Sequence, residues 1–153
     1  MKPLFPDVLV NGKSIPSAAI AAEAQNHEAP SGKPGLAWKA AARALVVREL
    51  LLAEAAEQGV KADPAMLSPG KIETTDEAQI RGYLEEHLTP SPVKDDEVLA
   101  IFRQRTPEGD MPGNIAGDIR RKLEQRAWTN AASDVVARLV AKAEIVGIDM
   151  QKA

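Results

Sequence analysis

The chain has 153 residues, of which 44% are hydrophobic and 27% charged, and its formal net charge is −3. This length suits one domain, and the composition is typical of a soluble globular protein with a sizeable core. The absence of cysteine excludes disulfides, thiolate metal sites and cysteine nucleophiles. Only two histidines are present, which excludes a three-histidine metal site within one chain.

The charge and hydropathy patterns also limit the compartment and the partners. A net charge of −3 gives no general attraction to nucleic acid or to anionic membranes. No apolar run approaches the roughly 18 residues of a membrane span, and residues 1–7 lack the apolar core of a signal peptide. We therefore expect a cytoplasmic protein without membrane insertion, or a periplasmic one if a signal peptide has been removed.

The N-terminal region predicts a β-hairpin followed by a helix. Residues 8–10 and 13–15 are short β-prone runs, and Asn11-Gly12 between them tolerates the positive φ angles of a type I′ turn. Pro16 is suited to the start of a helix, which we expect over 17–27. The prolines and glycines of 28–35 then predict a loop.

The longest uninterrupted pattern in the first half of the chain predicts a helix over 36–58, which ends at Gly59. Its centre is apolar on nearly all sides, and this indicates burial by several neighbours. Residues 60–74 contain prolines and a glycine and predict a long loop, with Met66 and Leu67 in its middle.

The second half of the chain predicts three more helices. The first is expected over 75–88, with Thr75 as its N-cap. The second begins at 94 or 95 and continues to 102, and the third spans 114–143 with Asn114 as its N-cap. Residues 144–150 form a β-prone tail, and the N-terminal hairpin is the obvious partner for it. The predicted fold is therefore mainly α, with a small sheet formed by the N-terminal hairpin and the C-terminal strand.

Catalytic groups are scarce in this sequence. His27 and His87 fall near helix ends, where a structural or solvent-facing role is the ordinary interpretation. The carboxylates of Asp95-Asp96-Glu97 lie at a helix start, where an interaction with the helix dipole is a more ordinary role than binding of a metal ion. No catalytic triad spacing and no phosphate-binding glycine loop is present. We therefore expect no enzyme activity, no metal and no cofactor.

Two other residue groups could form binding surfaces. The basic cluster Arg120, Arg121, Lys122 and Arg126 is expected to be a solvated helix face, with nucleic-acid contact as the alternative. Aromatic residues at apolar helical positions are expected in the core by default, but an apolar groove with a flexible methionine would suit a peptide. The candidate peptide-binding residues are Trp38, Met66, Leu67, Tyr83 and Phe102.

Several segments occur in an order that is known from one protein family. They are Val10-Asn11-Gly12 with Ile15 and the helix after it, the segment 40–59, the run 93–98 followed by Ile101-Phe102, and the tail from Ile119 to Ile148. In this order they resemble the SurA-like chaperone domains of bacterial parvulin-type prolyl isomerases. The run from Val93 is similar to the family pattern V-x-D-E-E-V-x-x-Y-Y, with Ile101 and Phe102 in place of the tyrosine pair.

The resemblance implies a single chaperone-like domain over 1–153. Its parts are an N-terminal helical part (1–104), a junction (105–113) where a parvulin domain would sit, and a C-terminal helix and strand that complete the core (114–153). The histidines and the G-G-x-L-G segment of a parvulin site are missing. The implied function is ATP-independent binding of unfolded or partly folded, apolar polypeptide segments, as in a holdase-type chaperone.

Three alternatives remain open at this point. Prolyl cis-trans isomerase activity would belong to a longer parent protein, because this chain has no catalytic module. A dedicated helical adaptor or maturation factor would bind one partner protein. The long C-terminal helix could also be exchanged between two copies to give a homodimer.

Overall fold

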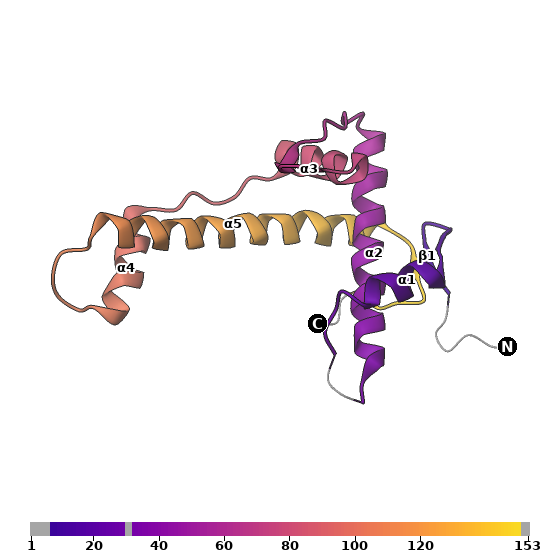
Figure 1. The fold of residues 1–153 in the computed structure, drawn as a ribbon, viewed down its shortest axis with the longest axis horizontal. Helices are drawn as coiled ribbons and strands as arrows, with labels where there is room; N and C mark the ends of the chain where they lie inside the picture. Colours follow the sequence, from indigo (N-terminus) through magenta and orange to yellow (C-terminus); the bar gives the residue numbers. More distant parts are fainter. Residues whose placement is uncertain (1–6, 30–31, 151–153) are drawn as a thin grey trace. The chain divides into compact units, whose positions relative to one another are not determined.

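The computed structural model describes residues 7–29 and 32–150 (Figure 1). The chain is mainly α-helical, with a small antiparallel sheet as predicted. Its helices are α1 (Ser17–Ala24), α2 (Pro34–Glu57), α3 (Thr75–His87), α4 (Asp95–Arg105) and α5 (Gly113–Lys142). Its strands are β1 (Val8–Val10), β2 (Lys13–Ile15), β3 (Met66–Ser68), β4 (Lys71–Ile72) and β5 (Ile145–Val146).

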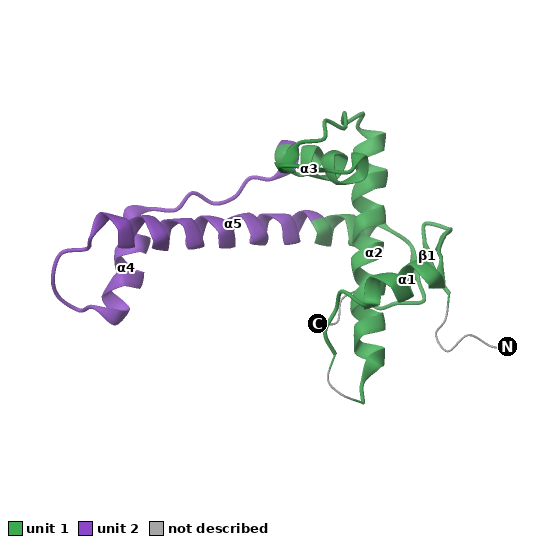
Figure 2. Cartoon of the chain, viewed as in Figure 1, with its two compact units in different colours: residues 1–85, 136–153 green, residues 86–135 purple. Residues whose placement is uncertain are grey.

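The chain divides into two compact units (Figure 2). Unit 1 comprises residues 1–85 and 136–153, and unit 2 comprises residues 86–135. The expected organisation as one domain with a junction at 105–113 stays a prediction. None of the helices in the described ranges combines the length and the apolarity required to cross a membrane.

The three-stranded sheet of unit 1 joins segments from both halves of the sequence. Its order is β2-β1-β5, and both pairings are antiparallel. The turn between β1 and β2 has φ angles of 51° at Asn11 and 84° at Gly12, as a type I′ turn requires. The Asn11 backbone N–H donates to the Glu144 carbonyl at 2.7 Å, and Asn11 Oδ1 accepts from the Glu144 N–H at 2.8 Å. The predicted pairing of the tail with the hairpin is therefore confirmed.

The core of unit 1 is built around the middle of α2, against which α1 and β1 pack. Ile20 of α1 and Val46 of α2 are almost completely buried, together with Val8 of β1. Ala41, Ala42 and Ala55 of α2 have no exposed surface, and their small side chains allow the neighbouring backbones to approach closely. The prediction that the centre of α2 is enclosed by several neighbours agrees with this burial.

The structure corrects the predicted loop over 60–74, because the middle of this segment is the β3–β4 hairpin. Pro69-Gly70 forms its turn, and the φ of Gly70 is 78°. Proline followed by a glycine with positive φ is the chemistry of a type II turn. The strands are three and two residues long, too short for an alternating pattern to be recognised.

Several helix ends also differ from the predicted ones. Thr74, not Thr75, caps α3, because its Oγ1 accepts the Glu77 N–H at 3.1 Å. Helix α5 begins at Gly113 rather than with Asn114 as its cap. Helix α1 is shorter and helix α4 is longer than expected. Helix α2 begins earlier than expected and includes Pro34 in its first turn, where a backbone N–H would have no partner within the helix.

In unit 2, Arg120 of α5 connects this helix to the segment before α4. Its Nη1 donates to the Val93 carbonyl at 2.9 Å, and its guanidinium pairs with Asp95. Arg103 of α4 donates to the Gly109 carbonyl at 2.8 Å and thereby holds the loop between the two helices. The Arg120 contacts tie Val93 and the first residue of α4 to α5.

Candidate functional site

The β3–β4 hairpin carries the largest concentration of exposed apolar side chains in unit 1. Met66, Leu67 and Ile72 are 71%, 53% and 65% exposed, and we call these three residues the hairpin surface. Met66 and Ile72 are direct partners in the antiparallel register. The two paired side chains, Met66 and Ile72, lie on the same face of the hairpin, and Leu67 follows on the other face. Three large exposed apolar side chains on so small an element are the kind of apolar surface that marks an interaction site.

A network centred on Arg81 of α3 holds the hairpin in place. Arg81 donates to both carboxylate oxygens of Glu73, with Nε to Oε2 at 3.1 Å, and to the Asp63 carbonyl at 2.9 Å. It also pairs with Glu85 one helical turn further on, at 3.0 Å. Glu73 in turn accepts the Ala65 N–H at 3.1 Å. Both ends of the hairpin are therefore fixed to α3. The hairpin surface thus lies on a hairpin whose position relative to α3 is set by hydrogen bonds.

The same network shifts the acid–base properties of its members. The hydrogen bonds from Arg81, followed by that from the Ala65 N–H, lower the pKa of the Glu73 carboxyl below its ordinary value. Glu73 raises the pKa of the Arg81 guanidinium further above its already high ordinary value. The ion pair is consequently intact throughout the neutral range.

Because the pKa of Glu73 is lower in the folded than in the unfolded chain, its stabilising contribution is complete above the ordinary pKa of 4.5. The contribution is lost as the pH falls below this value and through the folded pKa. We therefore expect the Glu73→Gln variant to lose less stability than the wild type between pH 6 and pH 3. Chemical unfolding curves of both proteins across this range check the prediction, and identical pH profiles would contradict it.

The residues predicted to bind peptide lie on different elements, four of them in unit 1 and one in unit 2. Met66 and Leu67 lie together on β3, whereas Trp38 is half-buried in the first turns of α2, about 28 Å along the helix from its C-terminal end. Tyr83 of α3 is only 4% exposed, and its burial raises the pKa of its hydroxyl. Phe102 belongs to unit 2, where it is half-buried and the Arg103 guanidinium lies 5.5 Å from its ring centroid.

Sequence reasoning missed Ile72 as a member of the hairpin surface. The signal that could have found it is the Pro-Gly pair at 69–70, which lies between Met66-Leu67 and Ile72. A turn at this pair makes β3 and β4 neighbouring strands and places Ile72 opposite Met66. The hairpin surface thus comprises two predicted residues and one that was overlooked.

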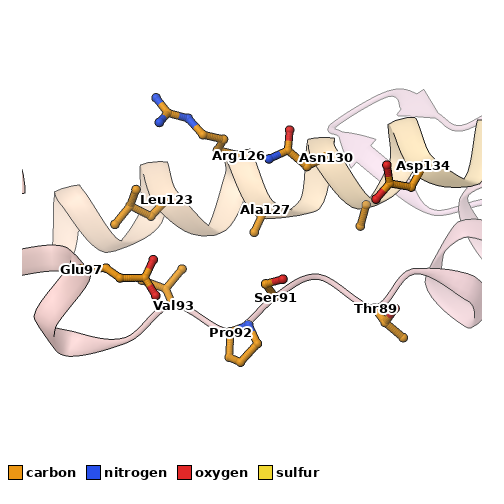
Figure 3. A pocket seen from close by; sticks show the side chains of 11 residues that line it. Thr89, Ser91, Pro92, Val93, Glu97, Leu123, Arg126, Ala127, Asn130 and Asp134 are labelled. Carbon is orange, nitrogen blue, oxygen red and sulfur yellow. The ribbon is translucent and has the colours of Figure 1, made fainter.

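A groove in unit 2 is the second candidate surface (Figure 3). It has a volume of about 370 Å³, which lies within the range of small-ligand sites, about 300–1,000 Å³. One wall is the segment 89–93 with the first turn of α4, and the other is a stripe of α5. Its lining residues are Thr89, Ser91, Pro92, Val93, Glu97, Leu123, Arg126, Ala127, Asn130, Ala131 and Asp134.

The basic cluster of α5 is partly committed to ion pairs. Arg120 binds Val93 and Asp95, and Arg121 pairs with Asp118. This arrangement leaves a helix face with both charge signs, as expected for the solvated face predicted from the sequence.

In the described part of the chain, the histidines and carboxylates do not gather into a metal site. His27 Nε2 lies 2.9 Å from the Glu23 carboxylate at the end of α1, and His87 is the last residue of α3. In the ranges 7–29 and 32–150, no group of three or more histidines and carboxylates lies close enough together to hold a metal ion. The structural interpretation of His27 is consistent with this contact to Glu23 one helical turn before it.

Comparison with known proteins identified no similar protein. No family model matches the chain, no curated protein matches it, and no solved structure matches it. The hairpin surface and the groove of unit 2 are thus the features on which a functional proposal can be based.

Proposed function

We propose that the protein is an ATP-independent, holdase-type chaperone that binds unfolded or partly folded polypeptides through the hairpin surface. The observation that carries this proposal is the exposure of Met66, Leu67 and Ile72 on a hairpin held by Arg81. A held apolar surface reduces the ordering cost of binding, because its own backbone is already fixed. The methionine can adapt its side chain to different clients.

The resemblance to SurA-like chaperone domains is part of this proposal. Support comes from the order of elements, in which a hairpin and four helices precede a long helix and a strand that returns to the hairpin. The binding that we propose is non-covalent, and it needs neither a catalytic residue nor a cofactor. Broad specificity is the expected consequence, because an adaptable apolar surface rejects related segments only weakly.

The direct test is suppression of aggregation of a guanidine-unfolded model protein of near-neutral charge, measured by light scattering without ATP. The wild type is expected to suppress aggregation with increasing molar ratio. A variant with serine at Met66, Leu67 and Ile72 should need at least about fivefold more protein for the same effect, because each apolar side chain contributes roughly 1.5–3 kcal/mol when fully buried. Its stability should change little, since the replaced side chains are mostly exposed.

The matched control is Leu36→Ser, which removes an exposed apolar side chain from the first turn of α2, outside the hairpin surface. This variant should suppress aggregation like the wild type. Equal suppression by the wild type and the hairpin variant would refute the role of the hairpin surface. A single stoichiometric partner in a pull-down, with no suppression of aggregation, would favour the dedicated adaptor instead.

A further inference from the structure

The groove of unit 2 offers many hydrogen-bond acceptors along one wall. Residues 89–93 form no regular secondary structure, and Pro90 and Pro92 have no backbone N–H to donate. Within the described part of the chain, no hydrogen bond is found to the main chain of 89–92, and these residues are exposed. Their carbonyl groups can therefore accept hydrogen bonds from a bound molecule.

The charged side chains of the groove add acceptors as well. Figure 3 shows the Glu97 carboxylate projecting into the space between the segment and α5, while Arg126 points away from the segment. Asp134 lines the groove on the α5 side, next to the end that Thr89 borders. One oxygen of Glu97 accepts the Lys94 N–H at 3.2 Å, which leaves the other oxygen for a ligand. A ligand in this groove therefore meets carboxylates and carbonyls, which favour a cationic donor.

The dimensions and the floor of the groove suit an extended chain. From Leu123 to Asp134, helix α5 rises about 16 Å, which equals the length of about five residues of extended polypeptide. Ala127 lies between these ends and faces Ser91 across the groove, and Ala131, one turn further on, also lines the groove. Such small side chains leave room for apolar side chains of moderate size in the centre.

From this geometry we propose that the groove binds an extended polypeptide segment with lysine or arginine near both ends and small apolar residues between them. Glu97 receives one basic side chain and Asp134 the other, while the carbonyls of 89–92 accept main-chain N–H groups of the segment. The proposal names the client class of the holdase and so rests on the proposed function. It assigns the groove a selectivity for basic segments that the hairpin surface does not have.

The test uses the full chain and two fluorescein-labelled peptides measured by fluorescence anisotropy. The first peptide has a five-residue centre with lysine at both ends and valine, alanine and valine between them. The second has glutamate in place of both lysines. The lysine peptide is expected to bind more tightly, and its affinity should fall as the salt concentration rises.

Two variants locate the binding. Glu97→Gln combined with Asp134→Asn should weaken binding of the lysine peptide about threefold to tenfold, as expected for the loss of two exposed charge pairs. Glutamine retains the oxygen that accepts the Lys94 N–H, so α4 keeps its cap. The control Glu124→Gln removes a carboxylate of α5 that does not line the groove, and it should leave the affinity unchanged.

Equal binding of the two peptides, or unchanged affinity in the double variant, would overturn the proposed groove. The serine variant of the hairpin surface separates the two proposals, because it should lose suppression of aggregation and still bind the lysine peptide. If the wild type suppresses aggregation but shows no preference for the lysine peptide, only the groove proposal fails. If it binds the lysine peptide but suppresses nothing, the proposed holdase function fails.

Discussion

Replacing Ile20 by alanine is expected to lower the free energy of unfolding by about 2–5 kcal/mol. Ile20 is only 1% exposed, and it is the one buried residue of α1, the short helix that packs against α2. Its truncation removes apolar contacts and leaves a cavity, because the closely packed alanines of α2 cannot move in to fill the space. Urea unfolding at 25 °C, followed by circular dichroism, measures the loss.

The matched control is Ile72→Ala, the same substitution on the exposed hairpin surface. Because the Ile72 side chain is already mostly in solvent, its truncation should change stability by less than about 0.5 kcal/mol. Similar losses in the two variants would show that α1 is not packed on α2 as described.

The second large effect is expected for Gly147→Ala, directly after β5. Gly147 has a φ of 92°, in a region that L-residues avoid, and a Cβ at this position would overlap the Asp7 carbonyl group. Strain of this kind costs about 1–3 kcal/mol, and displacement of the backbone around Asp7 adds to it. We expect a lower unfolding midpoint and faster hydrogen exchange of the Asn11 amide, which donates to Glu144.

Gly70→Ala separates the two causes. Gly70 also has a positive φ, 78°, but a Cβ there would meet nothing within 4 Å. This variant should therefore show the strain alone and a smaller loss of stability. A Gly147→Ala protein as stable as Gly70→Ala would disprove the close approach of Gly147 to the Asp7 carbonyl group.

The sequence predicted those elements whose signals are local. Asn11-Gly12 specifies its turn by backbone preference alone, and Gly59, with a φ of 70°, ends α2 where expected. The sequence also predicted that the C-terminal strand pairs with the N-terminal hairpin, because a lone β-prone tail needs a partner; the structure shows that the paired strand is β1. The β3–β4 hairpin was not recognised, since Met66 and Leu67 are consecutive apolar residues and show no alternation.

The candidate surfaces depend on tertiary contacts, which the spacing of residues along the sequence does not reveal. The positions of Arg81 and Glu73 in the sequence do not indicate that the guanidinium reaches over the end of a hairpin. Tyr83 occupied an apolar helical position, and tertiary packing buried it rather than exposing it to a client. The groove of unit 2 required knowledge of where 89–93 lies beside α5.

The pairing of β1 with β5 has a consequence for the way the chain reaches its native state. The hydrogen bond between Asn11 and Glu144 joins residues 133 positions apart. Closing so large a loop costs entropy before any contact compensates for it, so this step is expected to come late and to slow folding. During synthesis on the ribosome, β1 has to wait with an unpaired edge until residue 146 has left the exit tunnel. The nascent protein is therefore itself, for that interval, an incompletely folded chain with an exposed strand.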